Sequence, residues 1–357
     1  MRRPLDGGAR APVYGRFHLP PRPMTRRLPP LACLLAACAL AGGVLAGCAG
    51  SRPPAVVVAP AAEDPSALVV WTGGLAVAAG AEVRIVRGGA VGRVLALPGP
   101  VFALAGHDTL WAATAAGLFA LAGPDAEPAP VALPTRRPDA RVLSVAVGPD
   151  GRVWVGTAHD GAFVGRAGAW RRVTGASPVG GVAAQPEAVW LATHQGVSRR
   201  GADGRDARYT EEGTTEHGLL DNVTDRLWAT ADGAVWAVHP EGVSVFTDGE
   251  PHGYAFVGRR GAALLDAVAL PGGGYVLATT AGVLHVPSLE EKPQGFYEVY
   301  ADSGSDAAVL AAGRAPAPLA GSAPTRLALD GDVLWFASRD GLWSAPVALL
   351  RPALASR

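Results

Sequence analysis

Short apolar runs separated by turn residues fill most of the chain, and one phrase returns in six of them. The phrase reads apolar-Trp-x-x-Thr-x-x-Gly-apolar, and its copies are LWAATAAGL (110–118), VWVGTAHDGA (153–162), VWLATHQGV (189–197), VWAVHPEGV (235–243), YVLATTAGV (275–283) and LWFASRDGL (334–342). A degenerate copy, LVVWTGGL, covers 68–75. Short runs of this kind, bounded by glycine and acidic turn residues, predict β-strands.

Each copy sits inside a longer unit. A tight-turn signal such as Asp232-Gly233 or Asp330-Gly331 precedes most copies, another apolar run lies upstream of that turn, and alternating runs follow. The unit therefore reads as four strands. The glycines that end the phrase are Gly117, Gly161, Gly196, Gly242, Gly282 and Gly341, and they recur at the spacing of propeller blades, which is about 40–50 residues.

These repeats predict an all-β fold, a β-propeller of seven four-stranded blades over residues 67–350. The long Pro/Ala-rich stretch 311–325 is interpreted as a loop rather than as an eighth blade. Eight blades is the alternative count. A β-sandwich would not require a repeated Trp-Thr-Gly phrase. The tryptophans of the phrase are expected to pack as wedges between neighbouring blades, and they are Trp111, Trp154, Trp190, Trp236 and Trp335.

The phrasing resembles the two-component regulator propeller repeat family. The match is closest in Gly218-Leu219-Leu220-Asp221-Asn222-Val223 followed by Asp232-Gly233-Ala234-Val235-Trp236, and in Gly151 to Thr157. The resemblance covers roughly residues 66–348 and implies the propeller fold. Members of that family most often form the periplasmic sensor half of membrane histidine kinases, whereas here no second membrane segment and no kinase follow the repeats.

The N-terminal region reads as a lipoprotein signal over residues 24–47. Arg26 and Arg27 form a positive region, Leu31 to Leu45 form a short apolar region, and Leu45-Ala46-Gly47-Cys48 resembles the bacterial lipobox. The resemblance implies that Cys48 carries a lipid (diacylglyceryl and a fatty acyl group such as palmitate) and becomes the first residue. A plain secretory signal with an incidental cysteine is the alternative.

Residues 49–66 contain four prolines and, with Cys48, are interpreted as a tether, and residues 351–357 as a C-terminal tail. Residues 1–23 precede the signal, so Met24 is the expected start and Met1 the alternative. Ala49 after the cysteine implies the outer membrane, at its periplasmic face or surface, rather than the inner membrane. Removal of residues 1–47 takes away seven arginines and one aspartate, which leaves an acidic chain without a basic field for nucleic acid.

The chain carries no sequence motif for catalysis, a cofactor or a metal. All three cysteines lie in the first fifty residues, no His-x-x-x-His pair occurs, and no Gly-x-Ser-x-Gly elbow is present. The two x positions of each Thr-x-x-Gly turn should gather at one mouth of the propeller, and the loop before the fifth blade should open on the same face. This predicted rim, a candidate binding surface, contains His159, Asp160, His194, Gln195, His217, His239, Glu241, Arg339 and Asp340.

The simpler interpretation is that these rim residues are solvated turn positions without a binding role. His239 occupies the threonine slot of its copy and reads as a hydrogen-bonded structural residue rather than a ligand. The function expected from these features is a non-catalytic binding platform on an envelope lipoprotein, with a protein or small-ligand partner. The alternatives are a ligand-sensing partner of a separate membrane kinase and a metal-assisted lyase or lactone hydrolase.

Overall fold

A computed structural model describes residues 56–58, 63–137, 140–166, 168–175, 177–211, 218–240, 242–247, 249–255, 263–280, 282–286, 289, 296–298 and 323–347. Cys48, the signal peptide, His217, Glu241 and residues 351–357 therefore lie outside the described residues. No helix in the described part of the chain has the length and apolarity needed to cross a membrane.

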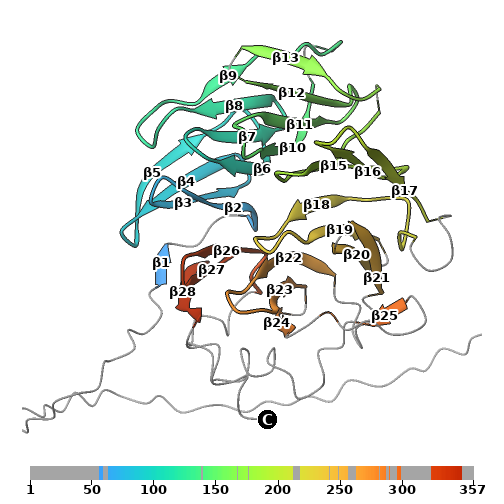
Figure 1. Cartoon of the computed structure of the whole chain (residues 1–357). Helices are drawn as coiled ribbons and strands as arrows, with labels where there is room; N and C mark the ends of the chain where they lie inside the picture. Colours follow the sequence, from blue (N-terminus) through green and yellow to red (C-terminus); the bar gives the residue numbers. More distant parts are fainter. Residues whose placement is uncertain are drawn as a thin grey trace, which may run out of the picture. The chain divides into compact units, whose positions relative to one another are not determined.

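The chain forms seven small antiparallel sheets arranged in a ring, a seven-bladed β-propeller (Figure 1). The first four blades take four consecutive strands each. Blade 1 contains β2 (Pro65–Trp71), β3 (Gly74–Ala79), β4 (Glu82–Arg87) and β5 (Ala90–Ala96); blade 2 contains β6 (Val101–Gly106), β7 (Leu110–Thr114), β8 (Gly117–Leu121) and β9 (Ala129–Val131). Blade 3 contains β10 (Val142–Val147), β11 (Val153–Thr157), β12 (Ala162–Arg166) and β13 (Ala169–Arg172); blade 4 contains β14 (Gly181–Ala184), β15 (Ala188–Thr193), β16 (Gly196–Gly201) and β17 (Asp206–Tyr209).

The last three blades complete the ring with variations. Blade 5 contains β18 (Arg226–Ala229), β19 (Val235–His239), β20 (Gly242–Thr247) and β21 (Glu250–Ala255), and β25 (Phe296–Glu298) pairs with β21 in parallel. Blade 6 is described over β22 (Leu264–Ala269), β23 (Tyr275–Thr279) and β24 (Gly282–Val286). Blade 7 contains β26 (Arg326–Asp330), β27 (Val333–Ser338) and β28 (Gly341–Pro346), and its fourth strand is β1 (Val56–Val58) from the start of the described chain.

The ring is therefore closed by a strand that lies within the stretch interpreted from sequence as a tether. Val56 pairs with Trp343 and Val58 with Leu342. Figure 1 shows β1, in blue, beside β28, in red. The two ends of the propeller repeat thus share one sheet, which joins the first and last blades directly.

The core consists of clusters between neighbouring blades, because each second strand is buried on both faces. In β7, Leu110 and Ala112 join a cluster with blade 1, while Trp111 and Ala113 join a cluster with blade 3. This is the period-two alternation of a strand. The phrase tryptophans repeat that placement, each packing toward the next blade around the ring: Trp111, Trp154, Trp190, Trp236 and Trp335.

The degenerate copy at 68–75 was wrong in register. Residues 68–75 span the first hairpin of blade 1, where Trp71 pairs with Gly74, instead of the second. The turn equivalent to Thr-x-x-Gly in this blade is Gly80-Ala81, between β3 and β4. The count of seven blades is unaffected, because blade 1 still supplies four strands.

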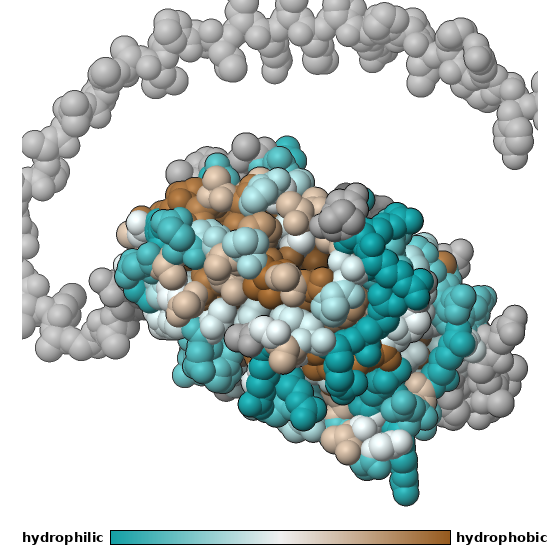
Figure 2. Space-filling model, turned by 90° about the horizontal axis from the view of Figure 1, so that it is seen from above, coloured by the Kyte–Doolittle hydropathy of each residue, from teal (hydrophilic) through white to brown (hydrophobic). Residues whose placement is uncertain are grey.

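One face of the propeller carries both hydrophobic and hydrophilic regions. Figure 2 shows hydrophobic residues gathered across part of one face, with hydrophilic residues along its edges.

Candidate functional site

The Thr-x-x-Gly turns are built by a local hydrogen-bond pattern. The hydroxyl of Thr114 donates to the carbonyl of Gly117 (2.9 Å) and accepts from the backbone N–H of Ala116 (3.0 Å). Thr193 makes the same pair of bonds, to Gly196 and from Gln195. The threonine satisfies backbone groups that the tight turn leaves unpaired, so its recurrence has a structural cause.

Most described rim residues are exposed. His159, His194, Gln195, Arg339 and Asp340 all have exposed side chains. Arg208 Nη2 donates to both oxygens of Gln195 (3.0 and 3.1 Å), and Arg339 pairs with Asp64 at 2.9 Å. Such contacts between exposed groups hold loops in place and contribute little stability.

Asp160 differs from its neighbours in the rim because it is buried, with 3 % of its surface exposed. Oδ1 accepts from the backbone N–H of Arg136 and from Arg172 Nη2, both at 3.3 Å, while Oδ2 has no hydrogen-bond partner among the described residues. It joins blade 3 to the segment that precedes it. This geometry gives Asp160 a structural position under the turn.

His239 is also buried, with 3 % exposed, and replaces the threonine of blade 5. Its Nδ1 lies 2.9 Å from the carbonyl oxygen of Val223, and its Nε2 lies 2.8 Å from Ser244 Oγ. Ser244 Oγ in turn accepts from the backbone N–H of Leu220 (3.1 Å). Burial lowers the pKa of His239, so the neutral ring ties the loop before blade 5 to strand β20.

The described rim residues supply neither a metal-binding group nor the lining of the three cavities described below. No three His, Cys, Asp or Glu side chains in the described ranges are grouped so as to hold one metal ion. Three cavities of the described structure are lined by other residues, and none of the described rim residues lines any of the three.

One of these cavities, of about 410 Å³, is the axial channel. In each blade, the tryptophan position of the repeat lies on the second strand and pairs with a residue of the first strand. The residue two positions before that partner, also on the first strand, lines the channel. These seven equivalent residues all line the channel, and they are Ala67, Ala103, Ser144, Gly181, Arg226, Asp266 and Arg326. Blades 1 to 4 thus supply small residues and blades 5 to 7 supply charges.

The charged residues of the channel form hydrogen bonds that connect blades 5, 6, 7 and 1. Arg226 Nη2 and Arg326 Nη1 both donate to the carbonyl oxygen of Leu265, and Arg326 Nε donates to Ser66 O (2.6 Å) in blade 1. The carboxylate of Asp266 accepts from the backbone N–H groups of Ala267 and Leu327, both at 2.9 Å. The Arg226 guanidinium also lies over the Trp228 ring at 5.2 Å.

Desolvation dominates the titration of this cluster. Burial and the positive charge of Arg226 together lower the pKa of Arg326 to about 10, against the opposing effect of Asp266. Burial also lowers the pKa of Arg226, and it raises the pKa of Asp266 against the opposing effect of the two arginines. The two guanidiniums therefore repel each other within a poorly solvated space.

Sequence reasoning missed this cluster because its members occur in strands that were treated as packing elements. Arg226-Leu227-Trp228, Asp266-Ala267-Val268 and Arg326-Leu327-Ala328 occupy equivalent places in their repeats. A charge in the first strand of three consecutive repeats, where earlier repeats have small residues, was the available signal.

The other two cavities are clefts between blades. The cleft between blades 3 and 4 has a volume of about 630 Å³, and the cleft between blades 4 and 5 about 780 Å³. Gln185 belongs to both, and the hairpin turn of β16 and β17, with Asp203, borders the second. Both are formed by turns between first and second strands and between third and fourth strands, whereas the predicted rim consists of the second-to-third-strand turns.

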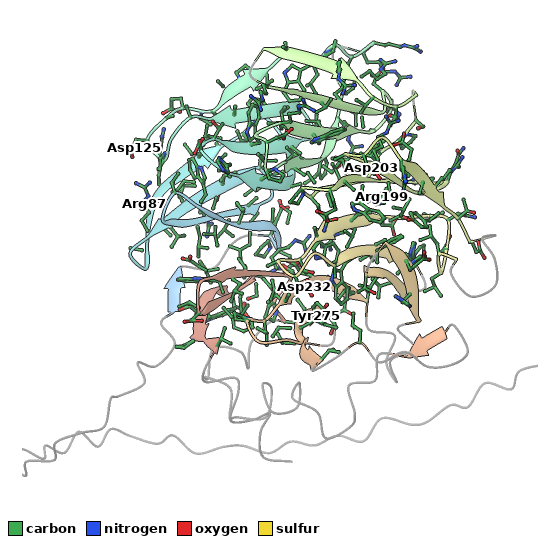
Figure 3. All side chains as sticks on the ribbon, viewed as in Figure 1. Arg87, Asp125, Arg199, Asp203, Asp232 and Tyr275 are labelled. Carbon is green, nitrogen blue, oxygen red and sulfur yellow. The ribbon has the colours of Figure 1, made fainter. Side chains whose placement is uncertain are left out.

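Aromatic rings form the floor of the cleft between blades 4 and 5. Trp190 and Tyr209 are stacked with centroids 5.8 Å apart, and Phe246 lies 4.6 Å from Trp190. Arg199 lies over Trp190 at 5.8 Å, and Tyr275 donates a hydrogen bond to Asp232 Oδ2 (2.5 Å) at the far side. Figure 3 shows Arg199 beside Asp203, and Asp232 beside Tyr275.

Comparison with known proteins supports the architecture. No family model matches the chain, and no curated protein matches it. Among solved structures, virginiamycin B lyase from Staphylococcus aureus is similar with a TM-score of 0.55 at 15 % identity, over 79 % of this chain and 94 % of that one. YCF48 bound to D1 peptide is similar with a TM-score of 0.55 at 13 % identity, over 83 % of this chain and 95 % of that one.

A third similar structure is the extracellular domain of a B. thetaiotaomicron protein described as a hybrid two-component system, with a TM-score of 0.53 at 11 % identity. The match covers 80 % of this chain and 40 % of that domain, so the chain spans about two-fifths of its length. Likeness at these identities shows the fold, and the prediction of an all-β, seven-bladed propeller is confirmed.

Proposed function

We propose that this chain is a non-catalytic binding protein of the cell envelope, held to a membrane by lipid on Cys48, with a protein partner bound over blades 3 to 5. The observation that carries the proposal is the pair of neighbouring clefts described above. Their volumes lie in the usual range of binding pockets, about 300–1,000 Å³. Two such clefts side by side suit a partner that inserts side chains into both.

The chemistry of the clefts favours a protein partner. Tyr209 and Arg199 are partly exposed and supply an aromatic ring and a planar cation, above the buried rings of Trp190 and Phe246. Tryptophan, tyrosine and arginine are enriched where binding energy concentrates in protein interfaces. Arg205 and Asp203 at the edge are exposed and would form the polar border of such an interface. The structure of YCF48 with a peptide gives a precedent for a propeller of this fold in that role.

A photo-crosslinking residue at Asp203 tests the location of the partner. Asp125 is the matched control, because it is exposed in the corresponding turn of blade 2 and lies away from Asp203 in Figure 3. We expect a discrete adduct from position 203 in intact cells, none from position 125, and loss of the adduct when Arg199→Ala and Arg205→Ala are combined. Equal adducts at both positions, or none at 203, would contradict the proposal.

A sensing role is the second candidate, and it rests on the likeness to the extracellular domain of the hybrid two-component system. In that case the partner crosslinked at Asp203 is a membrane kinase. A non-kinase envelope protein in the same adduct favours the first candidate instead.

The lipid anchor is tested with Cys48→Ser. We expect this variant to fold but to leave the membrane fraction, and to lose incorporation of labelled palmitate during growth. Retention of the variant in membranes after a high-salt wash would refute lipid anchoring, since salt removes electrostatic attachment only.

A further inference from the structure

The axial channel holds more positive than negative charge in its ring of equivalent residues. Arg226 and Arg326 face one carboxylate, Asp266, across that ring. No ion pair within 4.0 Å joins either guanidinium to Asp266 or to Asp225, the other described acid that lines the channel. Asp225 is exposed, and both oxygens of Asp266 accept backbone N–H groups. Within the described residues, no carboxylate therefore makes an ion pair with either arginine.

Part of their hydrogen-bonding capacity is also unused. Arg226 donates through Nη2 only, and Arg326 donates through Nε and Nη1. Arg226 Nε and Nη1 and Arg326 Nη2 make no bond within the described residues, and none of them is fully buried. Both arginines bond the carbonyl of Leu265, which brings the remaining donors into one neighbourhood. A guanidinium with unused N–H donors forms charge-assisted hydrogen bonds to carboxylate oxygens, and donors from two arginines can hold the two oxygens of one carboxylate.

The opposite wall of the channel has a different character. Phe102, Leu104 and Leu143 line it, together with Ala67 and Ala103 of the equivalent ring. A bare inorganic anion would leave this apolar wall against water. An anion with a short apolar body would cover it and gain about 25 cal/mol for each Å² of apolar surface buried.

We propose that the axial channel is a binding site for a small organic carboxylate, whose carboxylate group bridges Arg226 and Arg326 and whose apolar body lies against Phe102, Leu104 and Leu143. The ligand neutralises the repulsion between the two guanidiniums and supplies the acceptors that they lack. This site is separate from the clefts of blades 3 to 5, so it stands whether or not a protein partner binds there.

The purified propeller, titrated with benzoate and hexanoate, tests the site, and benzamide serves as the neutral analogue of benzoate. Trp228 reports binding through its fluorescence, since it lines the channel and lies under Arg226. We expect saturable binding of at least one carboxylate and about tenfold or greater weakening for benzamide, as a lost charge-assisted bond predicts. Inorganic phosphate binding as tightly as the carboxylates would overturn the role of the apolar wall.

Arg226→Gln should weaken carboxylate binding about tenfold, because it removes a charge and two unused donors but only one bond to the fold. The control is Arg87→Gln, since Arg87 is an exposed arginine at the end of β4 in blade 1. Equal affinity of wild type and Arg226→Gln would refute the site, as would failure of both carboxylates to bind wild type. If Arg226→Gln does not fold, the comparison of benzoate with benzamide on the wild-type protein decides the proposal.

Discussion

At the scale of single residues, His239 shows how one blade departs from its siblings without losing its turn. The threonine of other blades bonds within its own turn, whereas His239 reaches Val223 on one side and Ser244 on the other. An imidazole spans this distance and a threonine hydroxyl does not. The substitution therefore attaches the loop before blade 5 to that blade.

This burial predicts an acid-side loss of stability. Because the pKa of His239 is lowered from its ordinary value of 6.5, the unfolded chain binds more protons than the folded chain as pH falls below 6.5. The stabilisation is complete above that pH and is lost progressively toward and through the lower folded pKa. We expect His239→Gln to flatten the fall in unfolding free energy between about pH 7 and about pH 5, measured by urea unfolding.

His194→Gln is the control for that measurement, because His194 lies exposed in the equivalent turn of blade 4. It should keep the pH dependence of the wild-type protein. An unchanged slope in His239→Gln would mean that His239 does not couple protonation to folding.

Residues that repeat were predictable from sequence, and residues whose role depends on ring closure were not. The tryptophan and threonine positions could be assigned because each blade repeats the same packing and the same turn bond. Arg226, Asp266 and Arg326 meet only because three blades bring one strand position to the axis. No local sequence pattern predicts that these three residues meet. His159 and His194, which the turn pattern does identify, are exposed and line none of the three cavities.

At the scale of elements, the glycine that ends each phrase is required to different degrees. Gly117 and Gly161 both have positive φ angles, 123° and 81°. A Cβ at Gly161 would lie 2.1 Å from the carbonyl oxygen of Gly175, whereas a Cβ at Gly117 would have nothing within 4 Å. A residue with a Cβ at this position would therefore face backbone strain alone in blade 2, and backbone strain plus a steric clash in blade 3.

We expect Gly117→Ala to cost about 1–2 kcal/mol of unfolding free energy, for the positive φ alone. Gly161→Ala should cost roughly 3 kcal/mol or more, because a backbone carbonyl must also move. Urea unfolding of the two variants measures the difference. Equal costs would show that the segment after β13, which carries the Gly175 carbonyl, shifts freely, contrary to the observed packing.

The register error at 68–75 also belongs to this scale. Trp71-Thr72-Gly73-Gly74 contains the letters of the phrase, but a hairpin turn with those letters can join either the first two strands of a blade or the next two. The choice is made by packing: Trp71 lies against Gly106 of blade 2, where the tryptophan has room because a Cβ at that glycine would lie 3.1 Å from its ring. The glycine that accommodates Trp71 lies in a distant segment, so residues 68–75 alone do not show which two strands their turn joins.

At the scale of the whole propeller, closure depends on contacts between the two ends of the repeat region. Thr325 Oγ1 donates to Pro65 O (2.8 Å) and Arg326 Nε to Ser66 O, which joins blade 7 to blade 1 near the axis. At the outer edge, β1 covers β28. Without β1, β28 would be an edge strand with unpaired backbone groups.

Removal of β1 should therefore weaken closure without preventing folding, since the axial contacts remain. A protein that begins at residue 63 should melt several degrees below one that begins at residue 56, because a loss of 1 kcal/mol shifts Tm by about 2–4 °C in domains of 150–250 residues. The shorter protein should also self-associate through the uncovered β28, detectable by sedimentation. Identical melting temperatures for the two proteins would show that the axial contacts close the ring unaided and that β1 adds no stability.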